Sequence, residues 1–146
     1  MTNNIKMKLK NLFSCVLLIT LLSSCNDGIL KDSEVKETKA IIIKSGDKDL
    51  YARLCIYYYE KGEYESSLPY SMIMAYKYND KDAYYNIYKT ILQINSNGNS
   101  DYKAVKKLDK NSKEFALLNL TKSASLGCIS AKKDLDKYNL EESSKQ

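Results

Sequence analysis

The sequence predicts an all-α protein, organised as a short α-solenoid of about three antiparallel helix hairpins. The first observation is an internal repeat, because residues 46–51 (GDKDLY) recur as residues 79–84 (NDKDAY), 33 positions later. The second is that apolar residues follow each copy at intervals of four, which is the spacing of one face of an α-helix. A single hairpin cannot bury its apolar face alone, and about three stacked units are needed for a stable core.

The chain begins with the features of a secretory signal peptide, at residues 1–24. Lys6, Lys8 and Lys10 precede an apolar run from Leu12 to Leu22, and small residues follow it. A basic start, a short apolar run and small residues before a cleavage site are typical of such a peptide. The run is shorter than the ~20 apolar residues that span a bilayer. An uncleaved N-terminal anchor is the alternative.

The residues Leu22-Ser23-Ser24-Cys25 resemble the lipobox of bacterial lipoproteins, in which the cysteine is acylated and becomes the mature N-terminus. The resemblance implies that Cys25 carries a lipid anchor in the bacterial cell envelope, held effectively permanently by more than one acyl chain. Asn26 follows the cysteine, whereas an Asp at that place retains lipoproteins in the inner membrane. We therefore expect the outer membrane rather than the inner one. Residues 25–33 would form a tether with a reach of at most ~30 Å.

Removal of the signal peptide changes the charge and the cysteine count. The whole chain has a net charge of +5, but three lysines leave with the signal peptide, so that 20 basic side chains remain against 18 acidic ones. These alternate instead of forming a basic stripe, and we expect no nucleic-acid partner. Cys55 and Cys128 would be either a disulfide or small apolar packing residues. With no histidine and no C-x-x-C pair, we expect no metal and no cofactor.

We expect the helical-repeat domain to span residues 34–139, with helix–turn–helix units at roughly 34–60, 65–93 and 112–139. Each turn begins with Gly or Asn, the residue types that tolerate the left-handed conformation ending a helix; these are Gly46, Asn79 and Gly127. The helices after the turns carry one apolar face each, made by Leu50, Leu54 and Tyr58, by Ala83, Ile87 and Ile91, and by Ala131 and Leu135. The helices before the turns carry Val35 and Ile43, Leu68 and Tyr76, and Ala116 and Ala124 at matching places.

Helix starts and interruptions complete the expected layout. Asp47, Asp80 and Ser112 are the predicted N-caps, and Pro69 should fall in about the first turn of its helix, where a missing N–H costs little.

Residues 95–111 break the period and lengthen the second spacing to 48 positions. The polar residues Asn95–Ser100 indicate a loop, and Tyr102–Leu108 favour a short helical turn. The insert is either a mobile loop or a contact element, and residues 140–146 should form a disordered tail.

Two sets of residues resemble known helical repeats over about residues 34–139. Ala52, Leu54, Tyr58, Gly62 and Tyr64 are similar to the first helix and turn of a tetratricopeptide repeat, and Ala116, Leu120, Ala124, Gly127 and Ala131 are similar to the Sel-type variant. Cys55 and Ser67 depart from the small residues usual at their positions.

The resemblance implies a superhelix whose concave groove is lined by the first helix of each repeat and binds a peptide or a protein helix. Carried over by spacing from Leu54 and Ile87, the groove would expose eight residues. They are Asp49, Ala52, Ile56 and Tyr59 in one copy, and Asp82, Tyr85, Lys89 and Leu92 in the next.

The chain is poorly supplied with groups for catalysis. It lacks histidine, the commonest general base, and it has no phosphate-binding loop. The acids at positions 47, 49, 80 and 82 lie at helix starts, where capping and the helix dipole explain them better than catalysis or cation binding. We therefore expect no enzyme.

Tyrosine is the more informative residue type, since eleven of thirteen lie between Tyr51 and Tyr88. About a third of a helix circumference faces a core, so three consecutive tyrosines at 57–59 cannot all be buried. Some should be exposed at an interface, unless the tyrosine content reflects only a compositional bias and core filling.

Together these features predict a membrane-anchored, non-catalytic protein–protein interaction module of the bacterial envelope, with an unknown protein or peptide as its partner. The resemblance to Sel-type lipoproteins implies one alternative, a periplasmic immunity protein that neutralises a delivered antibacterial toxin. A structural envelope-assembly or surface lipoprotein is the other.

Overall fold

The computed structural model describes residues 29–144; the predicted signal peptide, Cys25 and the first part of the predicted tether lie outside them. Every regular element in this range is a helix, and the range contains no strand, which confirms the all-α class. The elements are η1 (Asp32–Glu34), α2 (Val35–Ser45), α3 (Lys48–Lys61), α4 (Tyr64–Tyr78), α5 (Lys81–Asn95), η2 (Tyr102–Lys107), α6 (Lys110–Ser125) and α7 (Ile129–Ser143), where η marks a 3₁₀ helix.

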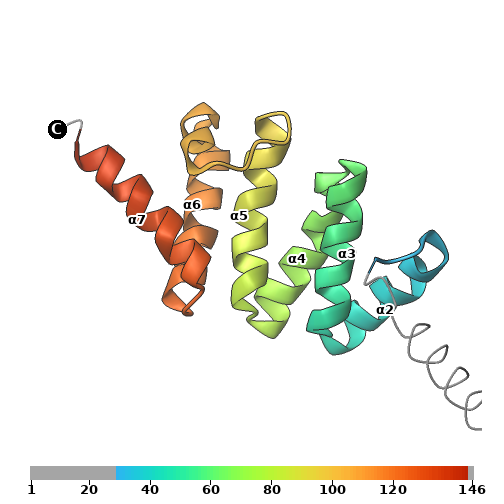
Figure 1. The fold of residues 1–146 in the computed structure, drawn as a ribbon. Helices are drawn as coiled ribbons and strands as arrows, with labels where there is room; N and C mark the ends of the chain where they lie inside the picture. Colours follow the sequence, from blue (N-terminus) through green and yellow to red (C-terminus); the bar gives the residue numbers. More distant parts are fainter. Residues whose placement is uncertain (1–28, 145–146) are drawn as a thin grey trace, which may run out of the picture.

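The helices follow one another in an elongated row, from α2 at one end to α7 at the other (Figure 1). Each α-helix packs against the next, and α2 also contacts α4. Helix α5 lies near the middle and contacts α4, α6 and η2. The buried side chains form one apolar cluster that continues along the row. None of the helices within residues 29–144 has the length and apolar character needed to cross a membrane.

The three predicted turns have the expected backbone conformation. Gly46, Asn79 and Gly127 have φ angles of 68°, 51° and 85°, all in the left-handed region. Asp47 caps α3 and Asp80 caps α5, as predicted.

Two predictions about helix starts were wrong. Asp109, and not Ser112, caps α6, because that helix already begins at Lys110. Pro69 lies beyond the first turn of α4, because that helix begins at Tyr64. Because proline has no backbone N–H, the carbonyl group one turn earlier in α4 lacks its usual helical hydrogen bond.

The buried face of α2 and α4 is shifted by one residue from the predicted one. Ile43 and Tyr76 are 45% and 51% exposed, whereas Ile42 and Ala75 are fully buried. The same faces bury small polar side chains, such as the fully buried Ser71. Apolar spacing alone could not find a face that includes serine. On the helices after the turns, residues such as Leu54 and Ile87 are buried as predicted.

The predicted tether of residues 25–33 is partly folded onto the domain. Leu30 is only 3% exposed and belongs to the apolar core. Asp32 accepts hydrogen bonds from the Tyr57 hydroxyl and the Lys61 ammonium, both at 2.8 Å. Burial of a leucine and these contacts with α3 hold the segment in place, so any tether from Cys25 is shorter than predicted.

The insert packs against the helices as a contact element. Helix α5 extends through Asn95, and the predicted helical turn is present as η2. Ala104, Val105 and Leu108 are 3%, 0% and 8% exposed, and η2 contacts α5, α6 and α7. The insert thus adds three apolar side chains to the core.

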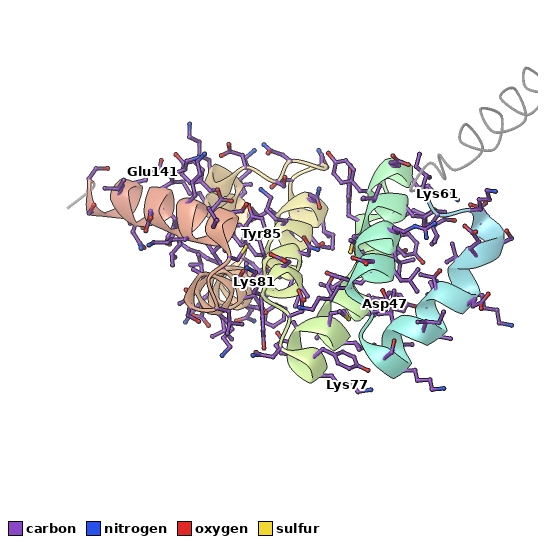
Figure 2. All side chains as sticks on the ribbon, turned by 60° about the horizontal axis from the view of Figure 1, so that its bottom comes forward. Asp47, Lys61, Lys77, Lys81, Tyr85 and Glu141 are labelled. Carbon is purple, nitrogen blue, oxygen red and sulfur yellow. The ribbon has the colours of Figure 1, made fainter. Side chains whose placement is uncertain are left out.

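The C-terminal residues also differ from their prediction as a disordered tail. Helix α7 continues to Ser143, and the Lys106 ammonium of η2 pairs with the Glu141 carboxylate. Figure 2 shows Glu141 on α7 and Lys61 at the end of α3, toward opposite ends of the row. The insert therefore holds the last turns of the chain by a contact that no local sequence pattern signals.

Candidate binding site between helices α3 and α5

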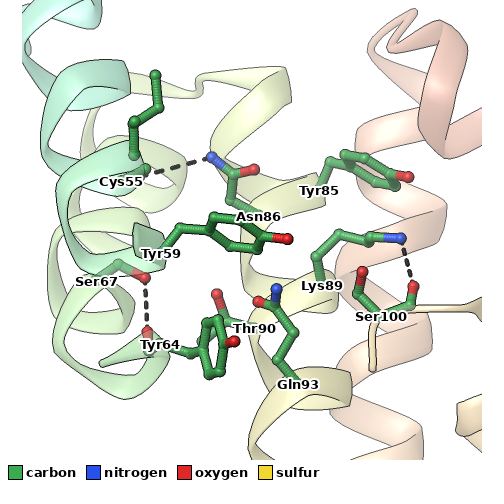
Figure 3. A pocket seen from close by; sticks show the side chains of 11 residues that line it. Cys55, Tyr59, Tyr64, Ser67, Tyr85, Asn86, Lys89, Thr90, Gln93 and Ser100 are labelled. Atoms are coloured by element: carbon green, nitrogen blue, oxygen red, sulfur yellow. Dashed lines mark hydrogen bonds between the residues drawn. The ribbon is translucent and has the colours of Figure 1, made fainter. Parts of the chain in front are cut away.

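A pocket of about 320 Å³ lies between α3 and α5 (Figure 3). Its volume is at the small end of the ~300–1,000 Å³ found for ligand sites. Its lining is mostly apolar and consists of Cys55, Ile56, Tyr59, Tyr64, Ser67, Tyr85, Asn86, Lys89, Thr90, Gln93 and Ser100. Three helices and the insert therefore contribute to one site.

Four of the eight predicted groove residues line this pocket, namely Ile56, Tyr59, Tyr85 and Lys89. Asp49, Ala52 and Asp82 are exposed but are not among the lining residues.

Leu92 was predicted in the groove wrongly, because it is 0% exposed and belongs to the core. The reason is that α5 packs against α4, α6 and η2, so a wider part of its circumference is buried than on α3. A single spacing rule applied to both helices misses this difference.

One wall of the pocket is apolar and partly exposed. Ile56 and Tyr59 are three positions apart and share a face of α3; they are 49% and 61% exposed. The Tyr59 ring meets the Tyr64 ring edge-on, with centroids 5.7 Å apart. Of the three consecutive tyrosines, Tyr58 is buried and Tyr57 half-buried, which agrees with the prediction that they cannot all face a core.

The opposite wall is a row of polar side chains on α5: Asn86, Thr90 and Gln93. The Asn86 amide donates to the Tyr51 hydroxyl at 2.9 Å. That hydroxyl donates to Ser71 Oγ at 2.8 Å, and Ser71 Oγ donates to a backbone carbonyl at 3.1 Å. This chain fixes the Asn86 amide and leaves its carbonyl oxygen as the group available to a ligand.

Thr90 and Gln93 are more fully enclosed, at 5% and 8% exposed. Both side chains point into the pocket (Figure 3). Their polar atoms make no hydrogen bond within the part of the chain that the structure describes. The sequence prediction missed this row because it lies one residue beyond the predicted positions. The i, i+4, i+7 spacing of polar residues was the signal available.

Lys89 lies at the rim, where its charge is compensated. Its ammonium donates to the Ser100 carbonyl of the insert, lies 3.7 Å from an Asp134 carboxylate oxygen, and is 5.6 Å from the centre of the Tyr85 ring. The Tyr85 hydroxyl donates to the same Asp134 oxygen at 2.9 Å. Burial, and then this bond, raise the pKa of the Tyr85 hydroxyl. Lys89 thus holds the insert against the pocket.

Cys55 and Cys128, the two cysteines within residues 29–144, are free thiols and form no disulfide with each other. Cys128 is buried, and Cys55 lies in the pocket wall. Burial raises the pKa of the Cys55 thiol to about 11. The thiol is therefore protonated at neutral pH, and the thiolate is the nucleophilic form.

Two of the four acids predicted to cap helix starts do so. Asp47 and Asp80 accept hydrogen bonds from the backbone at helix starts. Within residues 29–144, no group of three or more candidate metal-ligating side chains comes together. The pocket lining contains no carboxylate, so what it offers a ligand is aromatic surface, amides and hydroxyls.

Comparison of the chain with protein-family models, with curated proteins and with solved structures finds no significant match. Residues 29–144 thus form an all-helical structure with a small, mostly uncharged pocket between α3 and α5. Helical folds host many functions, so the function has to be inferred from the pocket and not from the fold.

Proposed function

We propose that this protein is a non-catalytic protein-interaction module of the bacterial envelope, attached to the outer membrane through an acylated Cys25, and that the pocket between α3 and α5 binds its partner. The observation that carries the proposal is the exposure of Ile56 and Tyr59 at the edge of a pocket. Large apolar side chains exposed together beside a cavity mark interaction sites, and tyrosine is enriched in protein interfaces.

The helix row is, in this proposal, a short superhelix of successive antiparallel helix pairs. Its support is the structural equivalence of positions one repeat apart. Asp47 and Asp80 both cap the helix that follows a left-handed residue. Leu54 and Ile87 are both fully buried. Such an array presents α3 and α5 side by side as the walls of one groove.

A photo-crosslinking experiment in living cells tests the interaction. A benzophenone amino acid replaces Tyr59, and a matched variant carries it in place of Ile94, which is 44% exposed on α5 outside the pocket lining. Irradiation should give a discrete protein adduct from position 59 that is missing from position 94. No adduct at position 59, or the same adducts at both positions, would contradict the proposal.

Mass spectrometry of the mature N-terminus tests the anchor independently. A Cys25 carrying two or three acyl chains is the expected result. An intact Met1 with Cys15 still present would contradict the proposed membrane attachment. The proposed interaction at the pocket would then be tested by the crosslinking experiment alone.

A further inference from the structure

We propose that the α3/α5 pocket binds a short extended peptide segment of the partner and encloses one uncharged, apolar side chain of that segment. This inference rests on the proposed interaction function and names the chemistry of the partner. Three features carry it: the compensated charge at the rim, the polar row on α5 and the apolar wall of α3 and α4.

The pocket offers no partner for a charged ligand group. Lys89 is the one lining residue with a formal charge at neutral pH, and its ammonium already binds the Ser100 carbonyl and lies 3.7 Å from Asp134. An ion entering the pocket would lose its hydration without gaining an opposite charge, which is strongly unfavourable. The site therefore selects uncharged groups.

The polar row on α5 is about as long as a three-residue segment of an extended peptide. Successive rises of ~6 Å from Asn86 to Thr90 and ~4.5 Å from Thr90 to Gln93 follow from the helical rise per residue. An extended chain repeats its backbone groups on one side every two residues, at ~6.8 Å. The row therefore spans about three peptide residues.

The groups of this row also have the right chemistry. Asn86 is held by Tyr51 with its carbonyl oxygen free to accept from a peptide N–H. The Thr90 hydroxyl and the Gln93 amide both donate and accept, as a peptide backbone does. Both residues are more than nine-tenths buried, so the little surface that they expose is the part that lines the pocket, and a bound peptide can take up their hydrogen-bonding groups there.

The facing wall accommodates a side chain of the bound segment. Tyr59 and Tyr64 present aromatic surface to the pocket (Figure 3), and Ile56 adds aliphatic surface to its lining. Backbone hydrogen bonds on one side and a side-chain pocket on the other are the two parts of extended-peptide recognition. The mostly apolar lining favours a peptide over a glycan, which presents hydroxyls on every side.

Nuclear magnetic resonance titration of the full chain in detergent micelles tests the inference. The side-chain amide signals of Asn86 and Gln93 report on the pocket directly. The probes are acetyl-Ala-Leu-Ala-amide, the matched peptides with Glu or Lys in the centre, and the disaccharide diacetylchitobiose. The leucine peptide should shift both signals saturably, with a Kd at least ~10-fold below that of either charged peptide, a difference set by the lost hydration.

Variants locate the effect. Thr90→Val keeps the side-chain shape and removes one hydrogen-bonding group, so affinity for the leucine peptide should fall by about 5-fold. Tyr59→Ala should also weaken binding, while Ile94→Ala, at a position that is 44% exposed outside the pocket lining, should not. The comparison of the three peptides uses the unaltered chain and does not depend on whether a variant folds.

Equal affinity for the charged and uncharged peptides overturns the inference. So do shifts caused by the disaccharide alone, or no shift with any peptide up to about 10 mM, a concentration that would detect even millimolar binding. A discrete crosslink at position 59 together with any of these results would keep the interaction function and reject the peptide chemistry.

Discussion

The Asp80 carboxylate ties together the two helices that form the pocket, and its replacement tests how the helix row is held. One oxygen accepts hydrogen bonds from the backbone N–H groups of Asp82 and Ala83, both at 2.9 Å. The other lies 2.8 Å from the Lys48 ammonium at the start of α3. Asp80 is 3% exposed, so water has little access to these backbone N–H groups, whereas the Lys48 ammonium is largely exposed.

The expected loss of stability follows from these contacts. Removal of an N-cap side chain costs about 1–2 kcal/mol. The N–H of the fully buried Ala83 is one of the two groups that lose their acceptor, which places the cost at the upper end of this range. The ion pair adds little, because Lys48 is 70% exposed. We expect Asp80→Ala to lower the free energy of unfolding by about 2 kcal/mol.

Asp47 provides the matched control. It caps α3 at the equivalent position, but it accepts one backbone hydrogen bond, from Leu50, and is half-buried. Asp47→Ala should therefore lower the free energy of unfolding by about 1 kcal/mol. Urea unfolding followed by circular dichroism measures both. Equal losses for the two variants, or a larger loss for Asp47→Ala, would refute this account of Asp80.

The same residue predicts a pH dependence. Burial raises the pKa of the Asp80 carboxyl, but hydrogen bonds from Lys48 and from the backbone of Ala83 and Asp82 outweigh it, and the pKa lies below its usual 3.8. The charge therefore stabilises the fold above the unfolded pKa, and this stability is lost as pH falls through the folded pKa. The difference between the parent chain and Asp80→Asn should be constant from about pH 7 to 5 and shrink below about pH 4.

Substitutions elsewhere test the insert, the first turn and the pocket thiol. Val105→Ala truncates a fully buried side chain of η2 and should lower the free energy of unfolding by about 1–3 kcal/mol. Proteolysis within residues 96–101 should become faster, and an unchanged cleavage rate would argue against docking of the insert. Gly46→Ala should lower the thermal unfolding temperature more than Gly62→Ala. Both glycines have a left-handed φ, but only at position 46 would an added Cβ lie 2.5 Å from the Tyr78 ring. Equal decreases in the unfolding temperature would contradict that packing. Maleimide labelling of Cys55 at pH 7, followed by mass spectrometry, should be about 100-fold slower than that of an unfolded thiol with a pKa of 9.0. The reason is that the pKa of Cys55 is about 11 and the thiolate fraction falls tenfold for each pKa unit. Labelling at the unfolded rate would show that the thiol is not buried.

Local signals explain the parts of the fold that the sequence predicted well. Gly46 and Asn79 mark left-handed turns, and Asp47 and Asp80 follow them as caps, so each boundary depends on residues adjacent in the chain. The helices after these turns carry regular apolar positions such as Leu54 and are buried there. Short-range chemistry determines these features, and the sequence displays it directly.

The missed features depend on contacts between distant segments. Leu30 and Glu141 are held by residues of other elements, and nothing adjacent in sequence distinguishes them from a linker or a tail. The one-residue shift on α2 and α4 has a related cause, because tight packing buries Ser71 as readily as Ile42. The burial of Leu92 comes from the central place of α5, which only the assembled row defines.

The pocket was predicted in part for the same reason. The exposed side of α3 followed from helical spacing, so Ile56 and Tyr59 were found. The polar row of Asn86, Thr90 and Gln93 was missed because enclosed polar side chains have no distinct sequence signature until the facing wall is known.

Hydrogen–deuterium exchange of the full chain, alone and with the partner crosslinked at position 59, tests most directly whether the α3/α5 pocket is the binding site. Binding there should slow exchange in the segments that line it, residues 55–67 and 85–100, and leave α2 and the C-terminal half of α7 unchanged. Protection confined to α2 or α7, with no change in residues 85–93, would contradict the account.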